Sequence, residues 1–214
     1  MPRPLNQDEL ELWASLGPPR TAHVKKDTIK YFPRPNGGDW DKFPLMRKMP
    51  WVGQLTTFTC AVACVRAILT ALGHDVSEES LRAIANTTKA GTTAEGIRKA
   101  LSAYNVPFST VSSLSNAKVR KAVRQGWPVI LEMSEWGGTH TVLVTAYEKG
   151  YGFLVMDPAI DGKRYYHVEE DPFTAFRWNP IRNKTFGGIV VQLAVDQPIA
   201  HEAPKTAPEH VIEP

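Results

Sequence analysis

The sequence has few cysteines, no long hydrophobic run and no run of one charge. Its 214 residues include only two cysteines, Cys60 and Cys64, which cannot make a disulfide framework. No stretch approaches the length of a transmembrane helix, and the N-terminus lacks the basic and then apolar segments of a signal peptide. Lys and Arg number 25 against 22 Asp and Glu and are dispersed, which indicates no nucleic-acid partner. These absences favour a reducing, cytoplasmic setting, in which thiols stay free.

The hydrophobic content suits one domain with a sizeable core, because 43% of the 214 residues are hydrophobic. Residues 1–49 are interrupted by prolines but contain several aromatic residues, so we expect an irregular arm that wraps over the domain. A short amphipathic helix is predicted within it, from Gln7 to Leu16. The tail at 197–214 is polar and proline-rich, which predicts disorder. The domain itself is expected to span residues 50–196.

Helical patterns come first in this predicted domain. After Cys60, apolar residues recur at helical spacing up to Leu72, and Gly73 supplies the left-handed residue that ends such a helix. The other predicted helices run from Ser77 to about Ala85, from a capping box at Thr92 and Glu95 to Tyr104, and from Ser115 to Gly126.

Strand patterns follow from Pro128 onward. β-branched and aliphatic runs bounded by Gly, Pro and Asp predict strands at 128–133, 139–147, 152–158, 164–168 and 188–194, with a short helix at 169–176. Helices first and antiparallel strands second are typical of an α+β fold, in which a helical half packs against a sheet half. A cleft between two such halves is a usual place for a site.

Cys60 is the first candidate for a chemical role. It lies on the first turn of a predicted helix, where the helix dipole lowers the pKa of a thiol and favours the nucleophilic thiolate. A free cysteine is more often a small buried hydrophobe, so this position alone leaves both interpretations open. Cys64 lies one turn along and is interpreted as a core residue. No further ligands at zinc-binding spacing accompany the pair, so the sequence indicates no metal and no cofactor.

His140 and Asp157 are the candidates for the base and its orienting group, both of which a cysteine nucleophile needs. His140 begins one predicted strand and Asp157 closes the next, so a hairpin would place both at the same end of the sheet. A strand-capping histidine and an Asp-Pro turn are the structural alternatives. Gln54 precedes Cys60 by six residues and could form an oxyanion hole with the Cys60 N–H, the alternative being a surface glutamine.

These four residues occur in an order that resembles the peptidase C39 family. The stretch SEESLRAIANTTKAGTTAEGIRKAL at 77–101 is also similar to the family's segment after the nucleophile helix, including a Gly-Thr-Thr turn at Gly91. The resemblance spans residues 50–195. Members are papain-like cysteine peptidases, best known as the bacteriocin-processing domains of peptide-exporting ABC transporters.

The resemblance implies a papain-like α+β fold and a Cys–His–Asp site. Cys60 would attack a carbonyl carbon, His140 would act as base and then acid, Asp157 would orient His140, and Gln54 would hold the oxyanion. The family cuts after a double glycine in leader peptides, which implies a peptide or protein substrate with a Gly-Gly or small-residue site. A separate transporter is a further partner that the family suggests.

The chain also departs from the family pattern. Ala61 follows the candidate nucleophile where many members have glycine, and no transporter domain accompanies the resemblance. Two other functions use the same residues or the same surface. One is a thiol acyltransferase or isopeptidase with the same acyl-enzyme, and the other is a leader-peptide-binding module without turnover.

Overall fold

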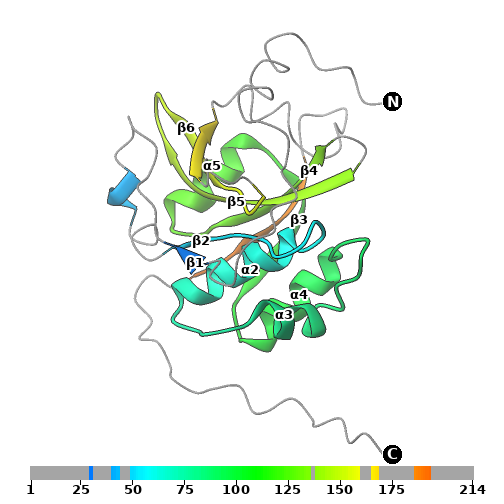
Figure 1. The fold of residues 1–214 in the computed structure, drawn as a ribbon. Coiled ribbons are helices and arrows are strands. Elements are labelled where there is room, and N and C mark those ends of the chain that lie inside the picture. The colour runs from blue at the N-terminus through cyan, green and yellow to red at the C-terminus, as the bar shows by residue number, and fades with distance from the viewer. Residues whose placement is uncertain are drawn as a thin grey trace, which may run out of the picture.

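The computed structural model describes residues 29–30, 40–43, 49–135, 138–159, 165–168 and 186–193. Its main feature is a six-stranded sheet with the order β3-β8-β4-β5-β6-β7, in which every neighbouring pair is antiparallel (Figure 1). The strands are β3 (Phe108–Leu114), β4 (Val129–Glu135), β5 (Gly138–Glu148), β6 (Gly152–Met156), β7 (Tyr165–Val168) and β8 (Phe186–Val191). The helices are α2 (Cys60–Ala71), α3 (Glu78–Ile84), α4 (Ala94–Ala103) and α5 (Asn116–Arg124). These elements confirm the α+β class.

Helices cover both faces of the sheet. One hydrophobic core joins α2, α3 and α4 to one sheet face and includes Ile68, Leu101 and Leu143. A second core lies between the other face and α5 and includes Val119 and Val142. Successive side chains of a strand point to opposite faces, which explains why neighbouring β5 residues belong to different cores. The predicted packing of helices against an antiparallel sheet is therefore confirmed, with α5 on the opposite face of the sheet from α2, α3 and α4.

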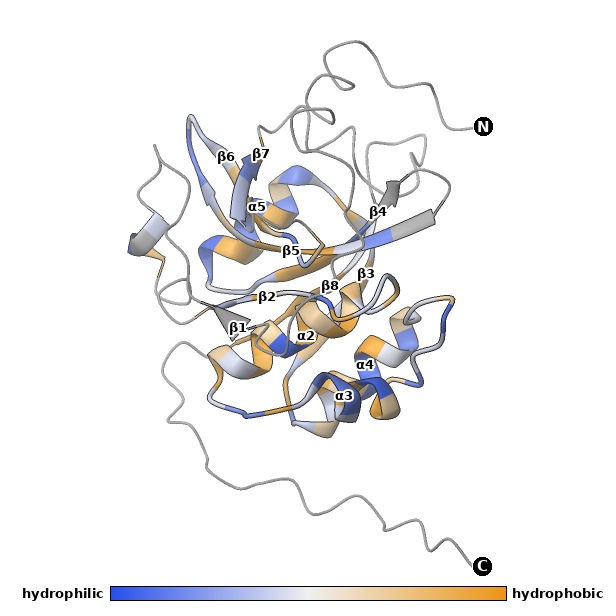
Figure 2. Cartoon of the chain, viewed as in Figure 1, coloured by the Kyte–Doolittle hydropathy of each residue, from blue (hydrophilic) through white to orange (hydrophobic). Residues whose placement is uncertain are grey.

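Helix α2 is the central element of the helical layer and carries Cys60 as its first residue. Ten of its 12 residues are buried, and Figure 2 shows it as predominantly hydrophobic. The helix ends as predicted, since Gly73 adopts a left-handed φ of 87° that a residue with a side chain rarely takes. A helix buried on most of its surface gives the residue at its N-terminus a fixed position relative to the sheet.

The helix starts and strand ends show which local predictions fail. Ser77 and Ser115 cap their helices as predicted, each accepting a backbone hydrogen bond. The capping residue of α4 is Thr93, whose hydroxyl accepts from Gly96 N at 3.1 Å, so the predicted capping box at Thr92 and Glu95 is wrong by one residue. Strand β3 was not predicted, and the last strand is Phe186–Val191 rather than 188–194. The predicted helices at 7–16 and 169–176 and the tail lie outside the described residues.

The described part of the N-terminal arm packs on the domain. Trp40 begins the short helix η1 (Trp40–Lys42), is only 2% exposed, and belongs to the core under α2. Strand β2 (Trp51–Val52) pairs with β1 (Ile29–Lys30) in a separate two-stranded sheet. Residues next to the predicted domain boundary thus share the hydrophobic core of the domain.

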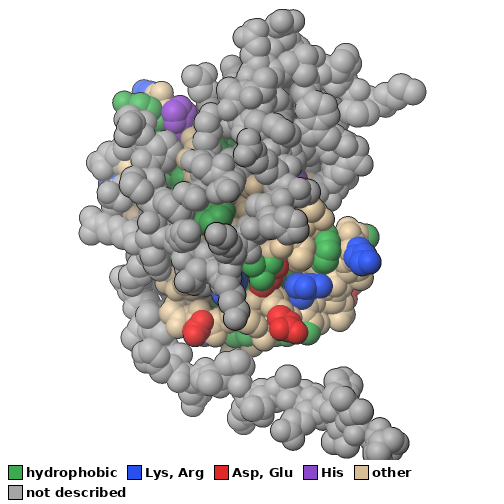
Figure 3. Space-filling model, in the orientation of Figure 1, with side chains coloured by type: hydrophobic (Ala, Val, Ile, Leu, Met, Phe, Trp, Pro, Cys, Tyr) green, Lys and Arg blue, Asp and Glu red, His purple; other side chains and the backbone are tan. Residues whose placement is uncertain are grey.

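The surface formed by α3 and α4 carries charges of both signs (Figure 3). Glu95 and Lys99, one helical turn apart on α4, form an ion pair of 3.2 Å. None of the helices in the described ranges has the length and apolar character that crossing a bilayer requires. Over the same ranges, no three His, Cys, Asp or Glu side chains are grouped so that they could hold a metal ion.

Candidate active site

Cys60 lies where helix α2 begins, and its side chain is buried, with 8% of its surface exposed. The preceding residue, Thr59, makes no side-chain cap on the helix, because its hydroxyl bonds within the loop to Thr56. The positive end of the helix dipole is therefore directed at Cys60 without a capping oxygen in between. Such a position favours a thiolate over a thiol.

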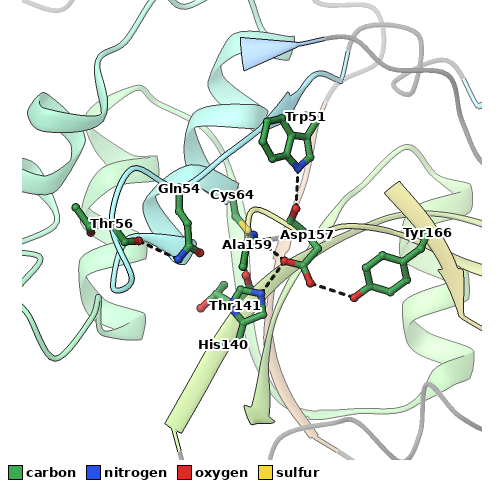
Figure 4. A network of polar contacts seen from close by, with 9 residues as sticks. All are labelled: Trp51, Gln54, Thr56, Cys64, His140, Thr141, Asp157, Ala159 and Tyr166. Carbon is green, nitrogen blue, oxygen red and sulfur yellow. Dashed lines mark hydrogen bonds and ion pairs between the residues drawn. The ribbon is translucent and has the colours of Figure 1, made fainter. Parts of the chain in front are cut away.

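The meander of β4, β5 and β6 brings His140 and Asp157 together, as predicted. His140 lies near the start of β5, and Asp157 follows the last residue of β6. The His140 Nε2 atom lies 2.8 Å from Asp157 Oδ1, and both side chains are buried (Figure 4). Because Nε2 is occupied by the carboxylate, Nδ1 is the ring nitrogen left to face the thiol of Cys60, with which His140 also forms a hydrogen bond.

The electrostatics of the pair favour a thiolate and an imidazolium. Burial raises the pKa of the Cys60 thiol, but the hydrogen bond and charge of His140, together with hydrogen bonds from Thr141, lower it, and the pKa falls below its ordinary value. Burial likewise lowers the pKa of His140, but the charge and hydrogen bond of Asp157, together with Cys60, hold that pKa well above its ordinary value. Each group thus favours the charged form of the other.

Thr141 is a neighbour of the thiol that the sequence analysis missed. Its backbone N–H and its hydroxyl both hydrogen-bond Cys60, and both interactions lower the pKa of the thiol. Its carbonyl accepts a weak hydrogen bond from Cys64 Sγ at 3.6 Å. Strand alternation predicts that Thr141 and His140 point to opposite faces, so only the position of α2 against β5 reveals that both contact Cys60.

Gln54 is buried, with 8% of its surface exposed, so it is not a surface glutamine. Its backbone N–H donates to the carbonyl of Pro158 at 3.1 Å, which links the loop before α2 to the segment that carries Asp157. Its Nε2 donates to the carbonyl of Thr56 at 2.9 Å, so one amide hydrogen is used within the loop and one remains (Figure 4). Direct contacts join Cys60, His140 and Asp157, whereas Gln54 is connected to them through the backbone.

Glu78 holds the loop that separates Gln54 from Cys60. Both of its carboxylate oxygens accept from the backbone N–H of Leu55, at 3.3 and 3.1 Å, and its residue is 2% exposed. Burial raises the pKa of Glu78, against the opposing effects of its hydrogen bonds and of nearby arginines. No role for Glu78 was predicted from the sequence, because its partner Leu55 is 23 positions away.

Cys64 is a core residue, as predicted. Burial raises the pKa of its thiol well above the ordinary value, and the negative charges of Cys60 and Asp157 add to that effect. Both cysteines are free, although they lie one turn apart on α2. The structure therefore separates two thiols of one helix into a polarised one beside His140 and a neutral one in the core.

Comparisons with known proteins identify the family of the chain. The model of the Peptidase_C39 like family matches residues 45–186. No curated protein matches the sequence.

Solved structures give the same assignment of the fold. The peptidase domain of Streptococcus ComA, a bi-functional ABC transporter involved in a quorum sensing pathway, is 19% identical with a TM-score of 0.55, covering 65% of this chain and 95% of that one. A double glycine motif protease from an AMS/PCAT transporter, solved with its leader peptide, is 19% identical with a TM-score of 0.51, covering 66% and 89%. A structure described as a C39-like peptidase from Bacillus anthracis is 14% identical with a TM-score of 0.51, covering 67% and 94%.

The fold is that of the papain-like C39 peptidase domains. Since the family model matches more than half of its residues, the chain belongs to the Peptidase_C39 like family. The resemblance inferred from the four residues and from the stretch at 77–101 is thereby confirmed at the level of family and fold.

Proposed function

We propose that this protein is a cysteine peptidase that hydrolyses a peptide bond through an acyl-enzyme on Cys60. The observation that carries the proposal is the contact chain from the thiol at the start of α2 through His140 to Asp157, with 2.8 Å between the last two. A nucleophile, a base and an orienting carboxylate in that order are the minimum set for thiol catalysis. The match to the C39-like family over 45–186 supports the assignment of residues 50–196 to the peptidase domain.

The first half of the proposed reaction forms a thioester. The Cys60 thiolate attacks the substrate carbonyl carbon, and the carbonyl oxygen becomes an oxyanion that the Cys60 N–H and the free Nε2 hydrogen of Gln54 stabilise. The imidazolium of His140 gives its Nδ1 proton to the leaving amine while the C–N bond breaks. Asp157 keeps its bond to Nε2 throughout and so holds the ring in one orientation.

The second half releases the acid. Neutral His140 takes a proton from a water molecule at Nδ1, the resulting hydroxide attacks the thioester carbonyl, and the C–S bond breaks. The thiolate and the imidazolium are thereby restored. A thiol acyltransferase would follow the same steps with an amine in place of water, so the acceptor decides between hydrolysis and transfer.

Peptides that end at small residues are the proposed substrates. One of the similar structures is a double glycine motif protease bound to a leader peptide, which supports a peptide substrate with a Gly-Gly or other small-residue site. The free, unpaired Cys60 suits a reducing compartment such as the cytoplasm. Because the similar structures are peptidases of transporters, a separate transporter is a further proposed partner.

A matched peptide panel tests this proposal. Peptides that differ only in having Gly-Gly, Gly-Ala or Val-Val before the cleavage position are incubated with the protein, and mass spectrometry identifies the products. We expect cleavage after Gly-Gly or Gly-Ala and none after Val-Val, because the similarity to a double glycine motif protease favours small residues before the cleaved bond. An added amine that appears in the product would indicate acyl transfer, and binding without any product would indicate a peptide-binding module.

The pH dependence of thiol alkylation tests the state of Cys60. Because the pKa of Cys60 is lowered and that of His140 is raised, the charged thiolate–imidazolium pair is favoured over the neutral pair. We expect iodoacetamide to label Cys60 rapidly at pH values well below the ordinary thiol pKa, with the rate falling only when acid protonates the thiolate. Cys64 provides the internal reference, because its raised pKa and burial predict slow labelling. Equal slow labelling of both thiols would contradict an activated nucleophile.

A further inference from the structure

The Asp157 carboxylate has more partners than His140. Oδ1 accepts from the ring of His140 at 2.8 Å and from the backbone N–H of Ala159 at 2.9 Å. Oδ2 accepts from the phenolic hydroxyl of Tyr166 at 3.2 Å, and Figure 4 shows this hydroxyl directed at the carboxylate. Both oxygens of the Asp157 carboxylate thus accept hydrogen bonds, and the donor to Oδ2 is the Tyr166 hydroxyl.

Tyr166 reaches this position through the register of β6 and β7. Its partner across the two strands is Val155, and Asp157 lies two residues beyond Val155, where strand alternation returns the side chain to the same face. Both Tyr166 and Asp157 are buried, with 9% and 4% of their surfaces exposed. A hydrogen bond to a buried charge is among the strong ones in proteins, since water cannot replace it.

We propose that Tyr166 is a positioning residue for the reaction inferred above, and that its hydroxyl holds the Asp157 carboxylate so that Oδ1 stays directed at His140. The inference rests on the proposed function of Cys60, His140 and Asp157.

The physical need for such a donor follows from the torsion of the carboxylate. Rotation about the last bond of an aspartate side chain has broad minima, so rotamer preference alone does not fix which oxygen faces the imidazole. Donors on both oxygens do fix it. The same phenol also stabilises the negative charge of the Asp157 carboxylate, because its hydroxyl donates a hydrogen bond to that carboxylate.

The neighbouring residue Tyr165 provides a matched control. Its side chain is also buried, at 7% exposed, and its hydroxyl donates to the backbone carbonyls of Met49 and Pro50 at 3.2 and 3.1 Å. Tyr165→Phe and Tyr166→Phe therefore each remove one buried hydroxyl from the same strand. They differ in whether the lost hydrogen bond was made to Asp157.

The test measures iodoacetamide labelling of Cys60 across pH, together with kcat and KM on a cleaved peptide, in both variants. We expect Tyr166→Phe to slow labelling at neutral pH by about tenfold and to lower kcat with little change in KM. The acidic limb of the labelling profile should move to higher pH, because losing a hydrogen-bond donor disfavours the thiolate form of Cys60, in which the site carries more negative charge. Tyr165→Phe should leave the labelling profile at its wild-type position.

A double-mutant cycle separates positioning from packing. In an Asp157→Ala background, Tyr166→Phe should cost nothing further, because the carboxylate that it positions is already gone. A Tyr166→Phe profile identical to that of Tyr165→Phe, or a loss that persists in full without Asp157, would overturn the proposal. Rapid labelling of the wild-type thiol without peptide cleavage would reject the proposed hydrolysis but not the role of Tyr166. Labelling requires only the thiolate, so its rates still distinguish the two tyrosine variants.

Discussion

Cys60→Ala is expected to abolish peptide cleavage. The variant removes the only thiol that contacts His140 in the described residues, and loss of a covalent nucleophile typically costs at least about 10⁴-fold in kcat. Alanine is small enough to occupy the site, and it keeps the first turn of α2 because its helix propensity is high. Binding of an uncleaved substrate should be largely preserved, since catalysis is lost without loss of the surface. Product formation is followed by mass spectrometry, and affinity by titration.

Cys64→Ala is the matched control for this variant. Cys64 lies one turn further along α2, is fully buried, and has a raised thiol pKa, so it is unsuited to attack a carbonyl. Its loss leaves a small cavity that costs about 1 kcal/mol of stability, which thermal unfolding measures. Turnover should remain near that of the wild type. Cleavage that survives Cys60→Ala and disappears in Cys64→Ala would show that Cys64, and not Cys60, is the nucleophile.

The local elements of this fold were predictable because their signals are local. The helix that begins at Cys60, its end at Gly73 and the caps at Ser77 and Ser115 follow from spacing and from single residues. Strand β3 was missed because its sequence, FSTVSSL, alternates weakly and contains three serines and one threonine interrupted by a single valine. Its pairing with β8 at the edge of the sheet depends on residues about 80 positions away.

The candidate site was partly predictable for the same reason. Cys60, His140 and Asp157 stand at element boundaries that the sequence marks, and a hairpin is enough to place the last two together. Thr141, Glu78 and Tyr166 were not predictable, because their roles depend on how α2, α3 and β7 pack on residues distant in sequence.

The position of α5 depends on the same kind of information. A helix with one apolar stripe can cover either face of a sheet, and its own sequence does not say which. Here the buried Val119 and Val123 join the core that contains Val142 and Val144. The opposite face is covered by α2, α3 and α4, whose residues share a core with Leu143. At the start of α2, Cys60 contacts the polar residues His140 and Thr141 of β5.

His140→Ala is expected to slow acylation by several orders of magnitude while the chain still folds. Nucleophile and base act as one unit, so removal of either costs most of the rate that both supply. The thiol should also lose reactivity, because burial would continue to raise its pKa while the hydrogen bond and charge of His140, which lower that pKa, would be absent. Labelling of Cys60 at neutral pH should therefore fall together with turnover, which single-turnover cleavage and alkylation rates measure in parallel.

Two further variants make this result specific to the imidazole. His140→Gln introduces an amide that can donate to Asp157 but cannot accept a proton at neutral pH, so this variant should be as inactive as His140→Ala. Because the hydrogen bond to Asp157 is retained, it should unfold at a higher temperature than His140→Ala. His167→Ala removes an exposed imidazole from β7, where the ring contacts Tyr151, and should leave cleavage unchanged. Wild-type turnover in His140→Ala would remove His140 from the mechanism. Activity in His140→Gln would mean that the side chain acts by holding Asp157 rather than by moving a proton.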